Sequence, residues 1–275
     1  YMDQQGRHPA CPNESHVTGF IEYHRDERGN SVGTIKNRLM YLNQAYQYWQ
    51  DDAAFPHPQD YNPIDVAKGA VNLEKESPKE PPRLTIEELR ENVDKINHIR
   101  DRAIVTLQLK LGLRVSEVCN IKLSEVDIAN HDVRDHYDQM GEVSALQGRE
   151  NALYIPHDRD LNKSQCPRVL PLDDELRRVL VRYLLIRPDN GEPWLFLTKT
   201  QRGQMQKQDV NPIWKDVFHP EYAETDEHRA ITSHYGRHRF TTYWRVEEDL
   251  NRELIKYMRG DTAGSAQLDD MGAID

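Results

Sequence analysis

The stretch Leu111-Gly-Leu-Arg-Val-Ser-Glu-Val118 decides how this chain is interpreted. The apolar residues from Asp101 to Leu111 recur at helical spacing, and a glycine directly after such a run commonly ends a helix. Ser116 is placed to cap the helix that follows. Arg114 then stands at the start of that helix, where its planar guanidinium can reach into a cleft and bind a phosphate through two hydrogen bonds. An ordinary exposed arginine at a helix boundary is the alternative, so this stretch alone is only suggestive.

A second segment, His-Tyr-Gly-Arg-His at positions 234–238, also suits phosphate chemistry. His234 and Arg237 are three positions apart, so on a helix they share one face. Arg237 would hold a phosphate by its charge, and His234 would add a hydrogen bond or a proton transfer. By itself, a histidine and an arginine at this spacing are more often a polar helix face.

Lys163 is the third candidate. It lies in a polar turn between two β-prone runs, Ala152–Pro156 and Arg168–Leu172, which we predict to form a hairpin. A lysine on such a turn can swing into a site and protonate a leaving oxygen. As a single lysine it cannot be told apart from a surface residue.

Composition limits the class of protein. The chain has 275 residues, of which 37% are hydrophobic and 30% charged, and no apolar run approaches the ~20 residues of a membrane span. The net charge of −10 argues on average against nucleic-acid binding. Between His228 and Arg259, however, basic residues outnumber acidic ones.

Three widely spaced cysteines form neither a disulfide framework nor a zinc pattern, which favours a reducing compartment such as the cytoplasm.

Prolines and alternating charges divide the chain. We expect a helical domain over residues 1–72, a linker over 73–83 and a second domain over 84–275. We further expect several helices, in chain order: a short helix over Val17–Tyr23; a longer helix capped by Thr34 with an apolar stripe of Ile35, Leu39, Leu42, Tyr46 and Trp49 and with Lys36 and Arg38 on its exposed side; a helix capped by Thr85; and helices over Glu175–Ile186, Asp209–Val217 and His234–Met258.

The order of the motifs resembles that of the tyrosine recombinase, or phage integrase, family. Gly-Leu-Arg-x-Ser-Glu, a hairpin lysine ahead of Arg-Val-Leu-Pro-Leu, and His-x-x-Arg-His follow one another within one predicted domain. The resemblance implies a mainly helical fold with a small β-sheet, in which a core-binding domain precedes an α+β catalytic domain. It implies a catalytic set made up of Arg114, Lys163, His234 and Arg237. The segment Asn251–Asp261 is similar, more narrowly, to integrases of haloarchaea and their viruses, which predicts a viral or mobile-element origin.

The resemblance also implies an activity. A site-specific recombinase of this family breaks and rejoins double-stranded DNA through a 3′-phosphotyrosyl intermediate. Paired arginines would stabilise the extra negative charge at phosphorus, and the lysine would protonate the leaving 5′ oxygen. We expect neither a metal nor a nucleotide cofactor, because the phosphotyrosyl bond conserves the energy of the cleaved phosphodiester bond and the sequence contains no P-loop motif. The implied partner is attachment-site DNA, bound by a homotetramer in the cytoplasm (of the host cell, for a virus) without any membrane; the isolated chain is expected to be a monomer.

Two positions depart from the family pattern. Asp261 stands where the family has a histidine or tryptophan after the His-x-x-Arg helix. A carboxylate there repels phosphate unless it is paired, and Arg259 is the candidate partner, so Asp261 is included among the site residues. The second departure is that residues 262–275 contain no tyrosine, although the family's nucleophile is expected there. We therefore expect the tyrosine to follow Asp275 and the chain as given to be unable to cleave DNA by itself.

Three other interpretations remain open. A type IB topoisomerase would use the same catalytic residues, although the separate helical domain and the linker favour a recombinase. A non-catalytic, sequence-specific DNA-binding protein of the same fold would keep the phosphate-binding residues but never attach covalently to DNA. An acidic scaffold unrelated to DNA would require the order of the motifs to be a coincidence, so we rank it last.

Overall fold

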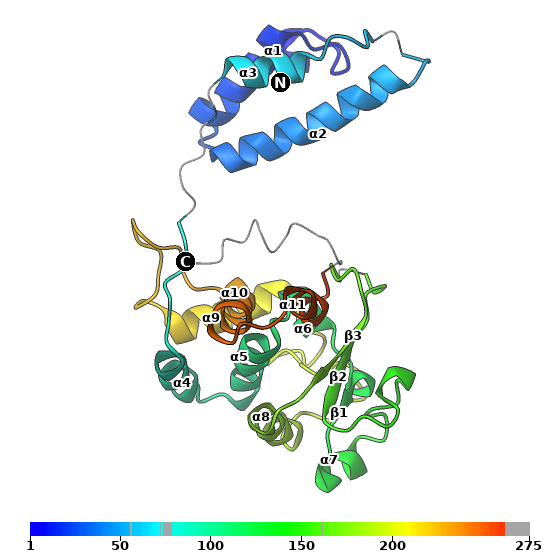
Figure 1. Cartoon of the computed structure of the whole chain (residues 1–275), viewed down its shortest axis with the longest axis vertical. Coiled ribbons are helices and arrows are strands. Elements are labelled where there is room, and N and C mark those ends of the chain that lie inside the picture. The colour runs from blue at the N-terminus through cyan, green and yellow to red at the C-terminus, as the bar shows by residue number, and fades with distance from the viewer. Residues whose placement is uncertain (56, 72, 74–78, 161, 262–275) are drawn as a thin grey trace. The chain divides into compact units, whose positions relative to one another are not determined.

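The computed structural model describes residues 1–55, 57–71, 73, 79–160 and 162–261. Contacts along the chain divide it into two compact units, Tyr1–Pro78 and Lys79–Asp275 (Figure 1). Within the described ranges, none of the helices combines the length and the apolar character that a membrane crossing requires. Part of the linker expected over 73–83 and the tail over 262–275 fall outside the described residues.

Unit 1 is helical. Its elements are the 3₁₀ turn η1 (Asp3–Gln5), α1 (Glu14–Glu22), the π turn η2 (Tyr23–Glu27), α2 (Val32–Asp51) and α3 (Pro63–Ala70). On α2, Ile35, Leu39 and Tyr46 are buried, as the apolar stripe predicts, because α1, η2 and α3 cover that face. Leu42, which was included in the stripe, is exposed.

The cap predicted for the long helix of unit 1 is wrong. Ser31, and not Thr34, precedes α2, and its hydroxyl accepts a hydrogen bond from the backbone N–H of Thr34 at 3.3 Å. Thr34 therefore lies within the first turn. Serine and threonine three positions apart are both good caps, and only the backbone of Ser31, which is extended at φ −60° and ψ 151°, distinguishes them.

Unit 2 combines helices with a small antiparallel sheet in the order β1–β2–β3 (Figure 1). This confirms the predicted fold class. Its elements are α4 (Ile86–Asp94), α5 (Ile99–Leu111), α6 (Val115–Asn120), η3 (Leu123–Glu125), β1 (Val126–Asp127), α7 (His131–His136), η4 (Ser144–Leu146), β2 (Ala152–Ile155), β3 (Arg168–Pro171), α8 (Asp174–Leu184), α9 (Lys207–Phe218), α10 (Ser233–Thr242), the π turn η5 (Tyr243–Glu247) and α11 (Arg252–Arg259).

The centre of unit 2 is α5, which is buried on nearly all sides because α4, α8, α9 and α10 pack against it. Gly112 ends α5 in a left-handed conformation with φ +61°. A Cβ atom at this position would lie 2.6 Å from the ring of Phe240 on α10, so glycine is required both by the backbone and by the packing. This turn brings the residues after α5 up to α10.

The hairpin prediction is confirmed. β2 and β3 pair in antiparallel fashion, with Ala152 opposite Pro171 and Ile155 opposite Arg168. Thr85 caps α4 as predicted, and the Thr85 backbone N–H donates a hydrogen bond to Glu88 Oε2 at 2.7 Å.

The continuous helix predicted over His234–Met258 is wrong. The backbone leaves the helix after Glu247, Asp249 adopts a positive φ of 48°, and α11 begins only at Arg252. Asn251 caps α11 by accepting a hydrogen bond from the Glu253 N–H at 2.8 Å. Asparagine and aspartate favour caps and left-handed turns over helix interiors, which explains the break.

Candidate active site

Arg114 lies directly before α6, at the N-cap position. Its backbone N–H donates a hydrogen bond to Glu117 Oε2 at 2.8 Å. This corrects the sequence prediction that Ser116 caps the helix, since Ser116 is buried inside α6. The Arg114 side chain is 20% exposed, and it is therefore the more accessible of the two arginines predicted to bind phosphate.

Arg237, the other member of that pair, comes from the middle of α10 and is only 2% exposed. Its Nη1 donates to the carbonyl oxygen of Gly112 at 2.8 Å, and its Nη2 donates to that of Arg259 at 3.0 Å. The neighbouring Gly236 allows the close contact of α10 with α5, because a Cβ there would lie 3.1 Å from the backbone of Gln108. The fold thus brings Arg237 next to the start of α6.

Asp261 joins the two arginines. Its Oδ1 accepts hydrogen bonds from Arg114 Nη2 at 2.7 Å and from Arg237 Nη2 at 3.0 Å. Its Oδ2 lies 3.0 Å from Arg259 Nε, which is the ion pair that the sequence suggested. The carboxylate is almost fully buried, at 1% exposure, so the three guanidinium groups compensate its charge.

A second buried carboxylate, Glu117, supports this arrangement from the sheet side. It pairs with Arg168 Nη2 at 2.9 Å, and both side chains have no exposed surface. The hydroxyl of Ser164 donates to Glu117 Oε1 and accepts from Arg168 Nη1 at 2.7 Å. Burial raises the pKa of Glu117, but Arg168, Arg237 and the Ser164 hydrogen bond outweigh it, so the pKa is lowered overall.

Lys163 lies in the loop between β2 and β3, directly before Ser164, and is exposed. This loop borders the arginines, because the N–H of Gln165 donates to the carbonyl oxygen of Gly260 at 2.9 Å. The Lys163 ammonium makes no hydrogen bond or ion pair with any described residue. The structure therefore places the loop at the site and leaves the amine of Lys163 outside the hydrogen-bond network.

His234 stands at the start of α10 and is exposed, one turn before Arg237. Its ring packs edge-on against His238, with 4.5 Å between the ring centres. Partial desolvation of the ring and the charge of Arg237 lower the pKa of His234. Burial, His234 and nearby arginines lower the pKa of His238 to about 4. Both imidazoles are therefore neutral at pH 7, and His234 can accept a proton.

The buried part of the site carries an excess of positive charge. Four guanidinium groups, those of Arg114, Arg168, Arg237 and Arg259, surround two carboxylates. Burial and the charges of Arg114 and Arg259 lower the pKa of Arg237 to about 9, which leaves it protonated at pH 7. A buried cluster with this excess attracts an anion.

The sequence motifs predict no role for Ser164 or Arg168. Ser164 carries no signal that distinguishes it from other residues of a polar turn. Arg168 does carry one, since it is a charged residue at the first position of an otherwise apolar strand, where it alternates inward with Leu170. An inward charge on a strand calls for a buried partner, and Glu117 of the Gly-Leu-Arg-x-Ser-Glu motif is that partner.

Known proteins are similar to this chain in sequence over much of its length. A tyrosine recombinase XerA of Pyrococcus horikoshii is 29% identical over 180 residues, which are 66% of this chain and 53% of that protein. A tyrosine recombinase XerD of Listeria monocytogenes is 24% identical over 243 residues, or 86% of this chain and 70% of that protein. The chain thus spans about half the length of the first of these curated relatives.

Solved structures share its fold. The Tn1549 transposon integrase in complex with circular intermediate DNA superposes with a TM-score of 0.68 at 18% identity, covering 95% of this chain and 82% of that chain. A lambda integrase in a tetramer bound to a Holliday junction gives a TM-score of 0.63 at 14% identity, covering 92% of this chain and 65% of that one.

The sequence pattern of the phage integrase family matches residues 83–260, which is well over half of the chain and includes Arg114, Lys163, His234 and Arg237. The resemblance that the order of the motifs suggested is thereby confirmed. This chain belongs to the phage integrase family.

Proposed function

We propose that this protein is a tyrosine-type site-specific recombinase, an enzyme that breaks and rejoins duplex DNA through a covalent link between a tyrosine and a 3′ phosphate. One observation carries the proposal. Arg114 Nη2 and Arg237 Nη2 converge on a single point, 2.7 Å and 3.0 Å from the oxygen atom that occupies it. Two guanidinium groups aimed at one oxygen suit a non-bridging oxygen of a phosphodiester, whose negative charge grows in the transition state.

The other candidate residues fit the remaining steps. His234, neutral at pH 7 and one helical turn from Arg237, is placed to help position or deprotonate the attacking hydroxyl. Lys163, whose amine has no partner among the described residues, supplies the proton for the leaving 5′ oxygen. Glu117, Ser164 and Arg168 act as positioning residues, because they fix the backbone of Arg114 and the loop of Lys163 to the same buried network.

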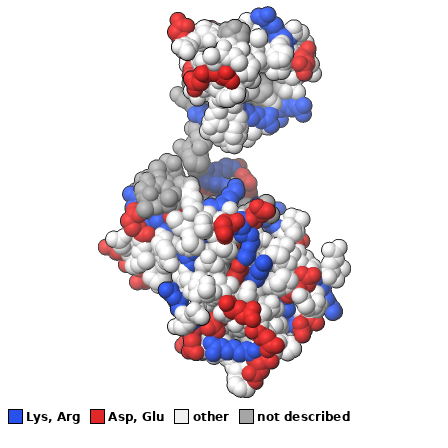
Figure 2. Space-filling view, turned by 90° about the vertical axis from the view of Figure 1, so that its right-hand side faces the viewer, with Lys and Arg blue, Asp and Glu red and all other residues white. Residues whose placement is uncertain are grey.

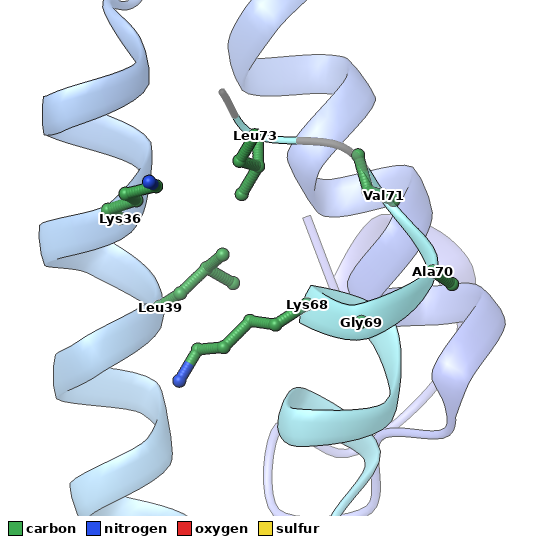
Figure 3. Close-up of a pocket in the computed structure, with 7 residues that line it drawn as sticks. All are labelled: Lys36, Leu39, Lys68, Gly69, Ala70, Val71 and Leu73. Carbon is green, nitrogen blue, oxygen red and sulfur yellow. The ribbon is translucent and has the colours of Figure 1, made fainter. Parts of the chain in front are cut away.

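Unit 1 supports a role as a core-binding domain that contacts the DNA backbone. It contains a hollow of about 570 Å³ between α2 and α3, where Lys36 and Lys68 extend from the two helices (Figure 3). Arg38, which the sequence places with Lys36 on the exposed side of α2, donates instead to the ring of His24 at 2.8 Å. Lys68 is a further candidate, and its ammonium makes one long contact with a described residue, 3.4 Å to Asp65.

The net charge of the protein does not contradict DNA binding. On the face of unit 2 shown in Figure 2, acidic and basic side chains are interspersed, so no uniform acidic surface repels phosphate there. The proposed partner is double-stranded DNA with attachment sites, and the proposed assembly on paired sites is a homotetramer; the lambda integrase tetramer bound to a Holliday junction supports this assembly. Archaeal relatives and the transposon integrase fit an origin in an archaeal virus or mobile element, with activity in the host cytoplasm.

A nicked suicide substrate tests the proposal. The chain, together with any residues that its gene encodes after Asp275, is incubated with nicked duplexes that carry its own attachment site. We expect a covalent protein–DNA adduct, which Arg114→Ala or Arg237→Ala abolishes, while the exposed-pair variant Arg177→Ala leaves it unchanged. If the extended protein forms no adduct, the protein binds DNA without cleaving it. If an adduct survives both arginine variants, the catalytic site lies elsewhere in the chain.

A salt titration of DNA binding tests the proposed contact of unit 1 with the DNA backbone. Each phosphate contact that is lost reduces the slope of log K against log salt concentration by about 1. We therefore expect Lys36→Gln and Lys68→Gln to flatten the slope for duplex DNA by about that amount each. Arg25→Gln is the matched control, because Asp26 already neutralises Arg25 at 2.7 Å. Equal slopes for all variants would exclude the hollow from the DNA interface.

A further inference from the structure

The anion position of the candidate site is already filled by the protein itself. Asp261 Oδ1 is the atom on which Arg114 Nη2 and Arg237 Nη2 converge. A carboxylate oxygen and a non-bridging phosphate oxygen accept the same hydrogen bonds from guanidinium groups, with similar lengths. An oxygen of DNA bound by both arginines would therefore have to stand where Asp261 Oδ1 stands now.

The arginines have few other donors to offer. Arg237 is 2% exposed, its Nη1 is engaged by the carbonyl oxygen of Gly112, and its Nη2 is shared between Asp261 and the carbonyl oxygen of Arg259. Arg114 Nη1 faces Glu117 Oε1 and the carbonyl oxygen of Arg259, each at 3.4 Å. The two arginines meet at two acceptors, Asp261 Oδ1 and the carbonyl oxygen of Arg259, and of these Asp261 Oδ1 is the side-chain atom that a phosphate oxygen can replace.

We propose that Asp261 is the resident anion of this site when DNA is absent, and that a phosphodiester oxygen must replace its carboxylate on Arg114 and Arg237 before strand cleavage. This inference rests on the proposed function of the same arginines. Asp261 then competes with DNA at the reacting phosphate.

The structure offers the displaced carboxylate a second place. Asp261 Oδ2 lies 3.0 Å from Arg259 Nε and also accepts a hydrogen bond from Arg237 Nη2 at 3.2 Å, so the side chain can stay paired with Arg259 while its contacts with Arg114 and Arg237 are broken. The backbone need not follow, because the N–H of Asp261 is bound to the carbonyl oxygen of Lys256 at 2.9 Å at the end of α11. Arg259 and Asp261 thus act together: one supplies the anion and the other keeps it in reach of the site.

Removal of the charge at position 261 should therefore strengthen anion binding. Asp261→Asn keeps the shape of the side chain but removes a negative charge beside the incoming phosphate. A unit charge about 5 Å from a bound phosphate, at an effective dielectric constant of ~20, changes the affinity by at least about tenfold even after screening by salt. If Asp261 served only to hold the arginines in place, the same substitution would weaken anion binding.

The experiment uses the whole 275-residue chain labelled with ¹⁵N-arginine, with inorganic phosphate added at constant ionic strength. The Nε–H resonances of Arg114 and Arg237 report phosphate at the site. We expect weak binding to the unaltered chain and a dissociation constant at least about tenfold lower for Asp261→Asn. Asp138→Asn, which removes one exposed carboxylate from the same unit, is the matched control and should leave the constant unchanged.

A second measurement uses the unaltered chain, so the inference can be tested even if Asp261→Asn does not fold. The ¹³Cγ resonance of Asp261 in the unaltered chain should shift as phosphate saturates the arginines. Phosphate that shifts Arg114 and Arg237 but leaves Asp261 ¹³Cγ and the affinity of Asp261→Asn unchanged would overturn this inference and leave the proposed function intact. Phosphate that shifts neither arginine in any variant would instead overturn the proposed function.

Discussion

The buried pair of Glu117 and Arg168 gives a prediction that tests the architecture of the site separately from any activity. The two side chains have no exposed surface and lie 2.9 Å apart. Removing one partner leaves the other as an uncompensated buried charge, which typically costs about 3–5 kcal/mol. We therefore expect Arg168→Met and Glu117→Met each to lower the free energy of unfolding by that amount.

The double variant should cost much less than the two single changes together. With both charges gone, two methionines of similar volume fill the space, and such a replacement is often close to neutral. Loss of the hydrogen bond from the Arg114 N–H to Glu117 adds about 1 kcal/mol, but it occurs in the single and in the double variant and therefore cancels in the cycle. The coupling between the two positions, which is the sum of the two single changes minus the double change, should therefore be about 5 kcal/mol or more.

Urea unfolding monitored by tryptophan fluorescence measures the free energy of unfolding of each variant and therefore the coupling. In a Trp49→Phe background the remaining tryptophans all belong to unit 2, so that the signal reports the unit that contains the pair. With a urea m value of about 3 kcal/mol/M, each single change should move the midpoint by about 1 M or more. Arg177→Met, which breaks an exposed pair with Asp174, should move it very little. Single changes that add without coupling would refute the buried-pair account.

Three further predictions concern the same unit. Gly112→Ala should cost about 2 kcal/mol or more in urea unfolding, because φ is +61° and the new Cβ would meet Phe240 at 2.6 Å; an unchanged midpoint would show that the turn can relax. Because the pKa of Glu117 is lowered in the folded state, its stabilising contribution is present above pH 4.5 and is lost as the pH falls through the folded-state pKa. In unfolding curves taken at successive pH values, the free energy of unfolding of Glu117→Gln should therefore be lower at neutral pH and should fall less steeply towards acid pH. The pKa of His238, lowered to about 4, means that the unfolded chain takes up a proton first, so stability should decline as the pH falls from 6.5 towards 4, and His238→Leu should flatten that decline in unfolding curves taken at successive pH values.

The sequence was sufficient for those parts of the fold that rest on local signals. Gly112 after an apolar helix, Thr85 before a pair of glutamates, and two β-prone runs around a polar turn each have a physical reason that acts within a few residues. Strand β1 was missed because two residues, Val126 and Asp127, are too few to show an alternating pattern. It is a strand only because β2 lies beside it.

The site shows the same division between local and distant causes. The motifs indicated Arg114 and Arg237, and the structure brings them together through α5, α6 and α10. Their common ligand, Asp261, depends on the end of α11, a helix whose start the sequence placed wrongly. The partner of Arg168 could not be predicted, since it is a carboxylate 51 positions earlier in the chain. Contacts of that kind are fixed by tertiary packing and not by local propensity.

A structure of the protein bound to duplex DNA that carries its attachment site tests the central claim most directly. The account predicts one phosphate oxygen within hydrogen-bonding distance of both Arg114 Nη2 and Arg237 Nη2, at the point that Asp261 Oδ1 occupies in the DNA-free chain. A complex in which the DNA is bound but no phosphate reaches these two arginines would contradict it.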